Sequence, residues 1–247
     1  MVLNSFKKFE YKNIENLKVI SDELYKALSD GDLSLRVNTC ICAPHFFGHK
    51  EIKPILDQHI SSILTIYINI IHEIELEELL ISLESIIEIF NEKCKDFAVD
   101  LTKILVEKFM YLIHVDEENM VKSNNNFIVL EGIVKTILCI IGIFNKFPDV
   151  FPAIFEKIKK IIEYGFTEEG FEKLEDSLEM IISMCKNDKL CFYPQVWQFF
   201  IPLIDSVVGT ELEIQELHAK GADKIFIGNG YEELQSVTNA ITLFIVR

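Results

Sequence analysis

Apolar residues recur along almost the whole chain at the spacing of an α-helix, and this periodicity restricts the fold more than any other feature. At 100° per residue, one face carries Leu76, Leu79, Leu83, Ile86, Ile87 and Phe90, and nearly the opposite face carries Glu73, Glu77, Glu84 and Glu88. Residues 168–185 show the same separation. The isoleucine-rich runs are longer than ordinary strands, and Gly (10) and Pro (6) are too scarce for many tight hairpin turns. The pattern therefore predicts a series of amphipathic helices.

Polar and glycine-containing breaks divide these helices into pairs. The first helix of each pair is expected to begin near Asn13, Ile52, Asp96, Asp149 and Pro194. Apart from the third, these intervals are close to the roughly 40–47 residues of HEAT and armadillo units. The longest interval contains the polar residues 115–126, a predicted surface insertion between the two helices of one pair. A final break is expected over residues 209–230.

Helix pairs in a regular row bury their apolar stripes only by stacking on neighbouring pairs. We therefore predict an all-α fold, an α-solenoid of about five antiparallel helix pairs in a right-handed superhelical stack. The predicted HEAT repeats of this single segment cover residues 13–47, 52–91, 96–144, 149–185 and 194–247. A compact helical bundle is the alternative, but it suits helices of such even length and spacing less well.

The chain is strongly acidic. It contains 24 Lys and Arg residues against 39 Asp and Glu residues, which gives a net charge of −15. Such a chain repels nucleic-acid phosphates, and no segregated basic patch is visible, so we expect no direct binding of DNA or RNA. An acidic surface instead suits basic partners, including basic protein tails, although solubility alone also explains such a charge.

The cysteines and the most apolar runs indicate a reducing compartment and no membrane span. Most of the six cysteines lie inside apolar helical runs, which favours free thiols over disulfides. The first residues lack the apolar core of a signal peptide. Segment 60–74 is too short to span a bilayer and segment 127–144 contains Glu131 and Lys135, so both are predicted to be buried helices.

The stretch TCICAPHFFGH, residues 39–49, places two cysteines and two histidines close together in sequence. A zinc ion requires about four ligands in tetrahedral geometry. On a continuous helix Cys42, His45 and His49 share a face, whereas Cys40 points away from Cys42. The same segment carries an apolar stripe that needs no metal, so we predict a buried helix and keep a metal-binding module as a third alternative. Pro44 is expected to kink this helix or to remove one of its hydrogen bonds.

The sequence contains no constellation of catalytic residues. Nucleophilic catalysis needs a base held next to Ser or Cys. The remaining histidines stand alone in helical contexts, and no G-x-S-x-G, P-loop or HExxH motif occurs. We therefore expect no enzyme activity, no cofactor, and no catalytic or metal-binding residues.

Short stretches on these helices resemble one family of helical-repeat proteins. Residues 28–38 (LSDGDLSLRVN) resemble the turn and second-helix start of a HEAT repeat. Residues 194–204 (PQVWQFFIPLI) closely resemble a segment of importin-β-type (karyopherin-β) transport receptors of the importin-seven and importin-eight branch. Residues 98–101, 132–137 and 171–178 agree with the same branch. The resemblance runs over roughly residues 13–208 and suggests an internal or C-terminal portion of a longer receptor.

The resemblance implies a nuclear transport receptor that shuttles between cytoplasm and nucleus through the nuclear pore. It implies recognition of basic protein cargo, such as ribosomal proteins or histones, and contact with Phe-Gly nucleoporins. Ran-GTP would bind N-terminal repeats, and nothing in this chain matches those repeats. The alternative from another class is a structural HEAT-repeat scaffold of a multiprotein complex with no transport role. Neither interpretation involves a membrane.

Acidic helix faces are the candidate binding surface. The second helices of HEAT repeats line the concave side, and both acidic faces are assigned to second helices, over residues 73–90 and 167–184. Aligned carboxylates create a negative potential that attracts Lys- and Arg-rich ligands, although any solvated helix also carries a charged face. The candidate cargo-facing residues are Glu73, Glu77, Glu84, Glu88, Glu168, Glu172, Glu175, Asp176 and Glu179.

Overall fold

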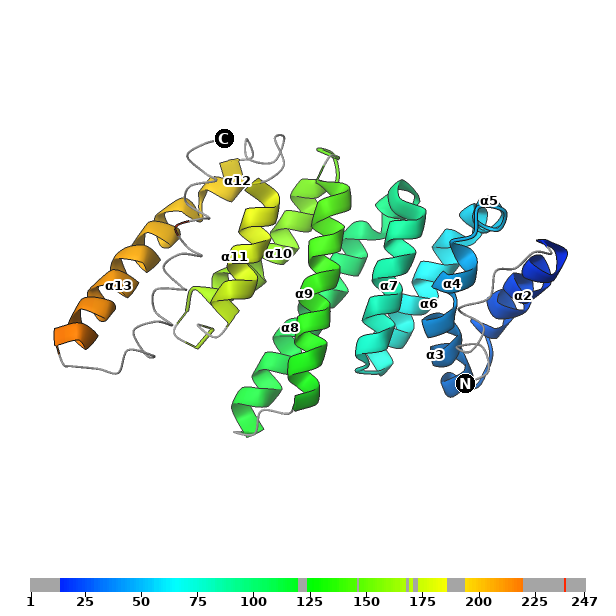
Figure 1. The fold of residues 1–247 in the computed structure, drawn as a ribbon, viewed down its shortest axis with the longest axis horizontal. Coiled ribbons are helices and arrows are strands. Elements are labelled where there is room, and N and C mark those ends of the chain that lie inside the picture. The colour runs from blue at the N-terminus through cyan, green and yellow to red at the C-terminus, as the bar shows by residue number, and fades with distance from the viewer. Residues whose placement is uncertain are drawn as a thin grey trace. The chain divides into compact units, whose positions relative to one another are not determined.

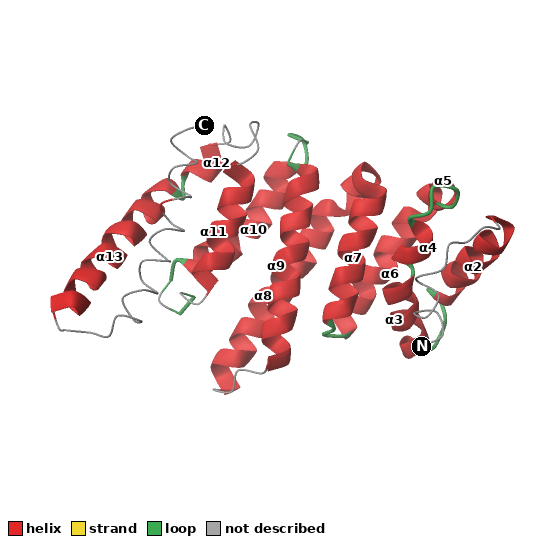
Figure 2. Ribbon diagram, viewed as in Figure 1, coloured by secondary structure: helices red, strands yellow, loops and turns green. Residues whose placement is uncertain are grey.

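Helices make up the structure, a computed structural model that describes residues 14–119, 124–145, 147–167, 169–170, 173–185 and 194–219, together with residue 238. No strand occurs among these residues (Figure 2). The chain divides into two compact units, Met1–Phe144 (unit 1) and Asn145–Arg247 (unit 2). The all-α fold class predicted from the sequence is confirmed.

In the described part of unit 1, antiparallel helix pairs stack in two layers. Its elements are α2 (Ile14–Ala27), α3 (Leu33–Cys42), α4 (Pro44–Phe47), α5 (Lys53–Leu56), the 3₁₀ turn η1 (Asp57–His59), α6 (Ile60–Glu73), α7 (Glu77–Phe90), the 3₁₀ turn η2 (Asn91–Phe97), α8 (Ala98–Asn119) and α9 (Asn124–Phe144). Contacts run from α3 to α7 and from α7 to α9 in one layer, and from α6 to α8 in the layer behind it (Figure 1). This stacking of pairs is the α-solenoid arrangement that the periodicity predicts.

Pro44 ends α3 and begins the short helix α4, so the predicted interruption is present. In a continuous helix the N–H of residue 44 would bond to the carbonyl of Cys40, four residues earlier. Proline has no N–H, although its fixed φ suits the first position of a new helix. The helical dihedrals continue through Ala43, whose φ and ψ are −52° and −43°. The break therefore removes the normal partner of one buried group, the Cys40 carbonyl.

Two buried hydroxyl groups of the next helix pair replace that missing partner. The hydroxyl oxygen of Tyr67, on α6, lies 2.6 Å from the Cys40 carbonyl oxygen and 2.7 Å from the Oγ of Ser82, on α7. Ser82 donates to the same carbonyl. Burial raises the pKa of Tyr67 well above its usual value, so the phenol keeps the proton that it donates. This network, the Cys40 hydroxyl network, connects α3, α6 and α7 inside the core.

Helices α7 and α9 approach each other closely at Gly132. A Cβ on Gly132 would lie 3.0 Å from Leu80 Cδ1 on α7, whereas a Cβ on Gly142, in the same helix, would meet nothing within 4 Å. One window of the described chain, Asn126–Phe144, has the length and apolarity of a membrane span, and 56% of it is buried inside the structure. The predicted buried helix at this position is therefore present as α9, packed against α7 and α8.

The described part of unit 2 is also helical, with α10 and α11 packed together. Its elements are α10 (Phe151–Gly165), α11 (Leu174–Cys185), α12 (Pro194–Trp197) and α13 (Phe200–Ala219). The rings of Phe155, on α10, and Phe199 meet edge to face with centroids 6.1 Å apart. Gly165 ends α10 where a Cβ would collide with the side chain of Ser177, whose Oγ lies 3.3 Å from the Ile161 carbonyl oxygen.

Two predicted interruptions are shorter than expected. Helix α13 continues through Gly209 to Ala219, so the break predicted over 209–230 is wrong for residues 209–219, and residues 220–230 lie outside the described residues. A Cβ on Gly209 would meet nothing within 4 Å, and good helix formers follow it, so one glycine of modest cost does not end the helix. Likewise α8 and α9 extend into both ends of the predicted insertion at 115–126. The repeat boundaries stay a prediction.

Removing the hydroxyls of the Cys40 hydroxyl network should lower the stability of the fold by an amount that depends on Pro44. The double change Tyr67→Phe and Ser82→Ala leaves a buried carbonyl without a partner and should lower the free energy of unfolding by about 1–3 kcal/mol, against about 0.5–1.5 for either single change. The change Pro44→Ala supplies the missing N–H. In that background the double change should cost clearly less in urea denaturation, and an equal cost in both backgrounds would contradict this account.

The two glycines of α9 form a matched pair. The change Gly142→Ala should raise the free energy of unfolding by about 0.5–1 kcal/mol, because alanine is the better helix former and the space is open. At Gly132 the same gain is opposed by the approach of Leu80, so Gly132→Ala should be less stable than Gly142→Ala by about 1 kcal/mol. Chemical denaturation of both variants measures the difference, and equal stabilities would show that the α7–α9 contact adapts freely.

Candidate binding surfaces

The predicted acidic residues of unit 1 do not all lie on one helix. Glu77, Glu84 and Glu88 lie on α7, the second helix of its pair, as expected. Glu73 is the last residue of α6, the first helix, so its assignment to the second helix is wrong. The chain turns between the two helices with extended backbone at Ile74 and Leu76, which a uniform helical periodicity does not reveal. The Glu73 carboxylate lies 3.7 Å from an Arg36 guanidinium nitrogen.

Glu84 is part of the contact between α7 and α9. Its carboxylate accepts a hydrogen bond from the Thr136 hydroxyl at 3.0 Å, and the residue is half-buried. Burial raises the pKa of the Glu84 carboxyl, the bond from Thr136 opposes this rise, and the charge of Glu88 adds to it. Glu88 is exposed. Of these two carboxylates, Glu88 is therefore the one open to a ligand, while Glu84 is hydrogen-bonded across the contact between α7 and α9.

A lysine that the sequence interpretation did not include lies beside these carboxylates. The Lys135 ammonium, on α9, is 2.6 Å from a carboxylate oxygen of Glu131. The bond to Glu131 raises the pKa of Lys135, and the charges of Glu77 and Glu84 raise it further. The surface along α7 and α9 therefore carries both signs of charge. The signal available in the sequence was the pair of small residues Gly132 and Thr136, which marks the α9 face that approaches α7.

In unit 2 the predicted carboxylates of α11 differ in exposure. Glu175 and Glu179 are exposed, whereas Asp176 is half-buried and lies 3.7 Å from the Lys173 ammonium. Burial raises the pKa of Asp176, and the nearby Lys173 opposes this rise. Asp176 therefore has a structural partner, and Glu175 and Glu179 are the carboxylates presented to solvent. Glu168 and Glu172 lie outside the described residues.

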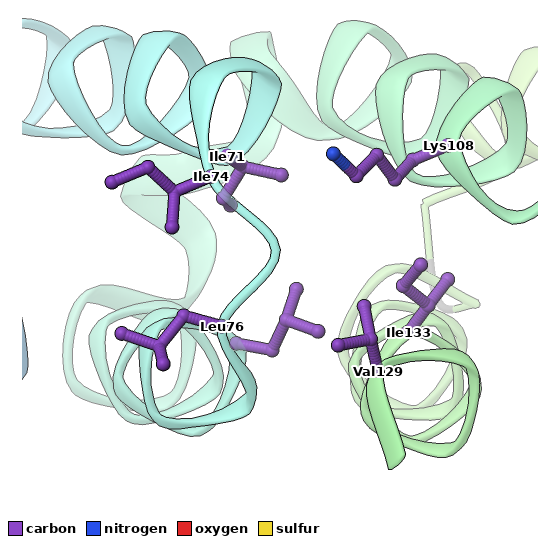
Figure 3. A pocket seen from close by; sticks show the side chains of 7 residues that line it. Ile71, Ile74, Leu76, Lys108, Val129 and Ile133 are labelled. Carbon is purple, nitrogen blue, oxygen red and sulfur yellow. The ribbon is translucent and has the colours of Figure 1, made fainter. Parts of the chain in front are cut away.

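Unit 1 also contains a small apolar hollow beside the turn between α6 and α7 (Figure 3). It is lined by Ile71, Ile74, Leu76, Leu80, Lys108, Val129 and Ile133. In Figure 3 the Lys108 side chain extends from α8 toward Ile71 and Ile74, and its ammonium lies 3.1 Å from Glu75. Its cavity volume is about 10 Å³. A cavity of that size holds about one water molecule, so the hollow is too small for a ligand side chain.

The cysteine- and histidine-containing stretch is divided by the break at Pro44. Cys40 and Cys42 are buried, whereas His45 is exposed and His49 is half-buried. Burial raises the pKa of the Cys40 thiol to about 12, so the thiol stays protonated. Within the described residues, no three His, Cys, Asp or Glu side chains are grouped so that they could hold a metal ion.

Comparison with known proteins connects these helices to nuclear transport receptors. The chain is 29% identical over 177 residues to a probable importin-7 homolog of Dictyostelium discoideum, covering 70% of this chain and 16% of that protein. It is 21% identical over 199 residues to human importin-8, covering 80% of this chain and 19% of that protein. It is 21% identical over 184 residues to an importin beta-like SAD2 homolog of Arabidopsis thaliana, covering 73% and 18%.

The matched region is less than a fifth of the length of each of these relatives. No family model matches the chain, and no solved structure matches it. The three relatives nevertheless come from a slime mould, an animal and a plant, and each match covers most of this chain. Together with the stacked helix pairs of unit 1, these matches agree with the resemblance carried by the PQVWQFFIPLI stretch, and they support an importin-β family segment.

Proposed function

We propose that this chain binds basic protein cargo as part of a nuclear transport receptor. The observation that supports the proposal is the exposure of carboxylates on second helices of both units, Glu88 on α7 and Glu175 and Glu179 on α11. They belong to a chain with a net charge of −15. Exposed carboxylates of one sign attract Lys- and Arg-rich segments and accelerate their encounter. Proteins of the importin-β family are transport receptors and not enzymes.

Some of the predicted cargo-facing carboxylates have a partner within the fold, and others are exposed to solvent. Glu84 and Asp176 each have a partner within the fold and a pKa raised by burial. A charge change at either position would alter folding as well as binding. Glu88 and Glu179 are exposed and lie one in each unit. They are therefore the positions at which charge can be changed with the least effect on packing.

Contact with Phe-Gly nucleoporins and shuttling through the pore are further parts of this proposal. They rest on the similarity to importins alone. Ran-GTP binding is assigned to N-terminal repeats that this chain does not match. A structural scaffold with no transport role is the alternative function.

Pull-down assays separate transport from scaffolding. A transport segment should be retained by immobilised Phe-Gly repeats and by an immobilised basic cargo such as a histone tail. Repeats in which serine replaces each phenylalanine should not retain the chain, because the apolar contact is lost. If neither ligand retains the unmodified chain, the result favours the alternative function, a structural scaffold with no transport role.

Charge reversal at the exposed carboxylates tests cargo binding directly. The double variant Glu88→Lys and Glu179→Lys should weaken binding of a Lys- and Arg-rich peptide by about tenfold at low salt, since the second helix in each unit then carries a repulsive charge in place of an attractive one. It should also reduce the dependence of affinity on salt. Fluorescence anisotropy at two salt concentrations measures both quantities.

The matched control is Glu107→Lys and Glu156→Lys. These residues are also exposed, one in each unit, but they lie on the first helices α8 and α10. The control changes the net charge by the same amount and should alter the affinity by less than about twofold. Equal weakening by both double variants would mean that the net charge alone attracts the peptide, and the proposed surface would then be wrong.

A further inference from the structure

Glu84 is a half-buried carboxylate that has no ion pair among the described residues. It lies on α7 where α9 packs against that helix. The neighbouring cation on α9, Lys135, is bound to Glu131 at 2.6 Å. Glu88, one turn further along α7, adds a second negative charge. A carboxylate that loses water and gains no counter-charge favours its protonated form.

The Thr136 hydroxyl, which bonds to Glu84, lies between two acceptors. Its oxygen is 3.0 Å from the Glu84 carboxylate and 2.9 Å from the Gly132 carbonyl oxygen. A hydroxyl has one proton to donate, and Thr136 is fully buried, so water does not supply another. While Glu84 is ionised, Thr136 can donate fully to only one of these oxygens. If Glu84 carries a proton, it donates to Thr136, and Thr136 donates to Gly132.

The other groups close to Glu84 do not remove this preference. The charge of Lys135 opposes protonation of Glu84, but its effect is smaller than those of burial and of Glu88. Cys139, on the next turn of α9, has a thiol whose pKa is raised to about 12, mainly by burial and also by Glu88 and Glu84. The thiol is therefore uncharged and provides no counter-charge.

The remaining elements packed against α7 present their charges elsewhere. Arg36 of α3 lies 3.7 Å from Glu73 of α6. His45 of α4 and His72 of α6 are exposed, and the 3₁₀ turn η2 begins two helical turns beyond Glu84. Burial, the like charge of Glu88 and the divided hydroxyl of Thr136 therefore all act in one direction.

We propose that Glu84 is a proton-operated contact between α7 and α9. With the proton bound, a chain of hydrogen bonds runs from Glu84 through Thr136 to the Gly132 carbonyl and joins the two helices. Release of the proton to water breaks this chain, places an unpaired charge in the contact and loosens it. The inference concerns the fold of unit 1 and does not depend on the proposed function.

The direction of the pH effect follows from the pKa of the Glu84 carboxyl, which burial raises above its ordinary value. The folded state then binds this proton more tightly than the unfolded state does. Below the ordinary pKa both states are protonated, and the contact contributes its full stability. As the pH rises through the raised pKa of the folded state, that contribution is lost.

Carbon-13 NMR of the full chain measures this protonation directly. Through-bond correlation to its own backbone assigns the Glu84 carboxyl signal, so no variant is needed. The midpoint of its titration should lie above about 4.3, the ordinary value for glutamate. A midpoint at or below that value would overturn the proposal.

Hydrogen exchange tests the effect on the helices. Glu84→Gln removes the charge and supplies an amide that donates to Thr136 at every pH. At pH 8 the α7 and α9 amides of this variant should exchange about two- to tenfold more slowly than those of the wild type, the factor expected for one hydrogen bond. At pH 4 the two proteins should exchange alike, because Glu84 is then protonated.

Two controls accompany this comparison. The α10 and α11 amides of unit 2 provide an internal control and should not differ between the proteins. Glu78→Gln makes the same charge change at an exposed position of α7 and should leave exchange unchanged at both pH values. An equal effect of Glu84→Gln at pH 4 and pH 8 would mean that packing and not the proton is responsible. Equal effects of the two variants would mean that net charge is responsible, and either result contradicts the proposal.

Discussion

A carbonyl group that loses its helical partner connects the first helix pairs of this protein. Pro44 cannot donate to Cys40, and a buried carbonyl without a hydrogen bond costs about 1–3 kcal/mol. Tyr67 and Ser82 satisfy it from α6 and α7. Because hydrogen bonds are directional, this network fixes how α3 lies against α6 and α7, which apolar contacts alone fix less strictly. The stacking of the second-helix layer continues from that fixed position.

The contact between α7 and α9 in that layer depends on a glycine and on a side-chain hydrogen bond. Gly132 lets α9 approach Leu80 of α7, and the Thr136 hydroxyl, one turn further on, reaches Glu84. The close approach of α7 and α9 also half-buries the Glu84 carboxylate, and this burial raises the pKa of Glu84. Packing therefore removes one predicted ligand-binding charge from the surface and leaves the exposed Glu88 beside it. In unit 2, Lys173 has a comparable effect on Asp176.

The carboxylates that remain exposed act mainly on the encounter with a ligand. Such charges act over about 8–10 Å at physiological salt and favour any basic ligand, so they influence encounter more than selection.

The sequence alone determined the helical class, most helix positions and the buried face of each helix, because the 3.6-residue periodicity of apolar residues is a local property. It also carried the family resemblance in short stretches such as PQVWQFFIPLI. Only the tertiary structure decided which carboxylates are free. Glu84 and Glu88 occupy the same acidic face in the sequence pattern, yet one meets Thr136 from a helix 52 residues away and the other meets solvent. Such long-range contacts, like the Tyr67 bond to Cys40, depend on how helices stack, which no local pattern specifies.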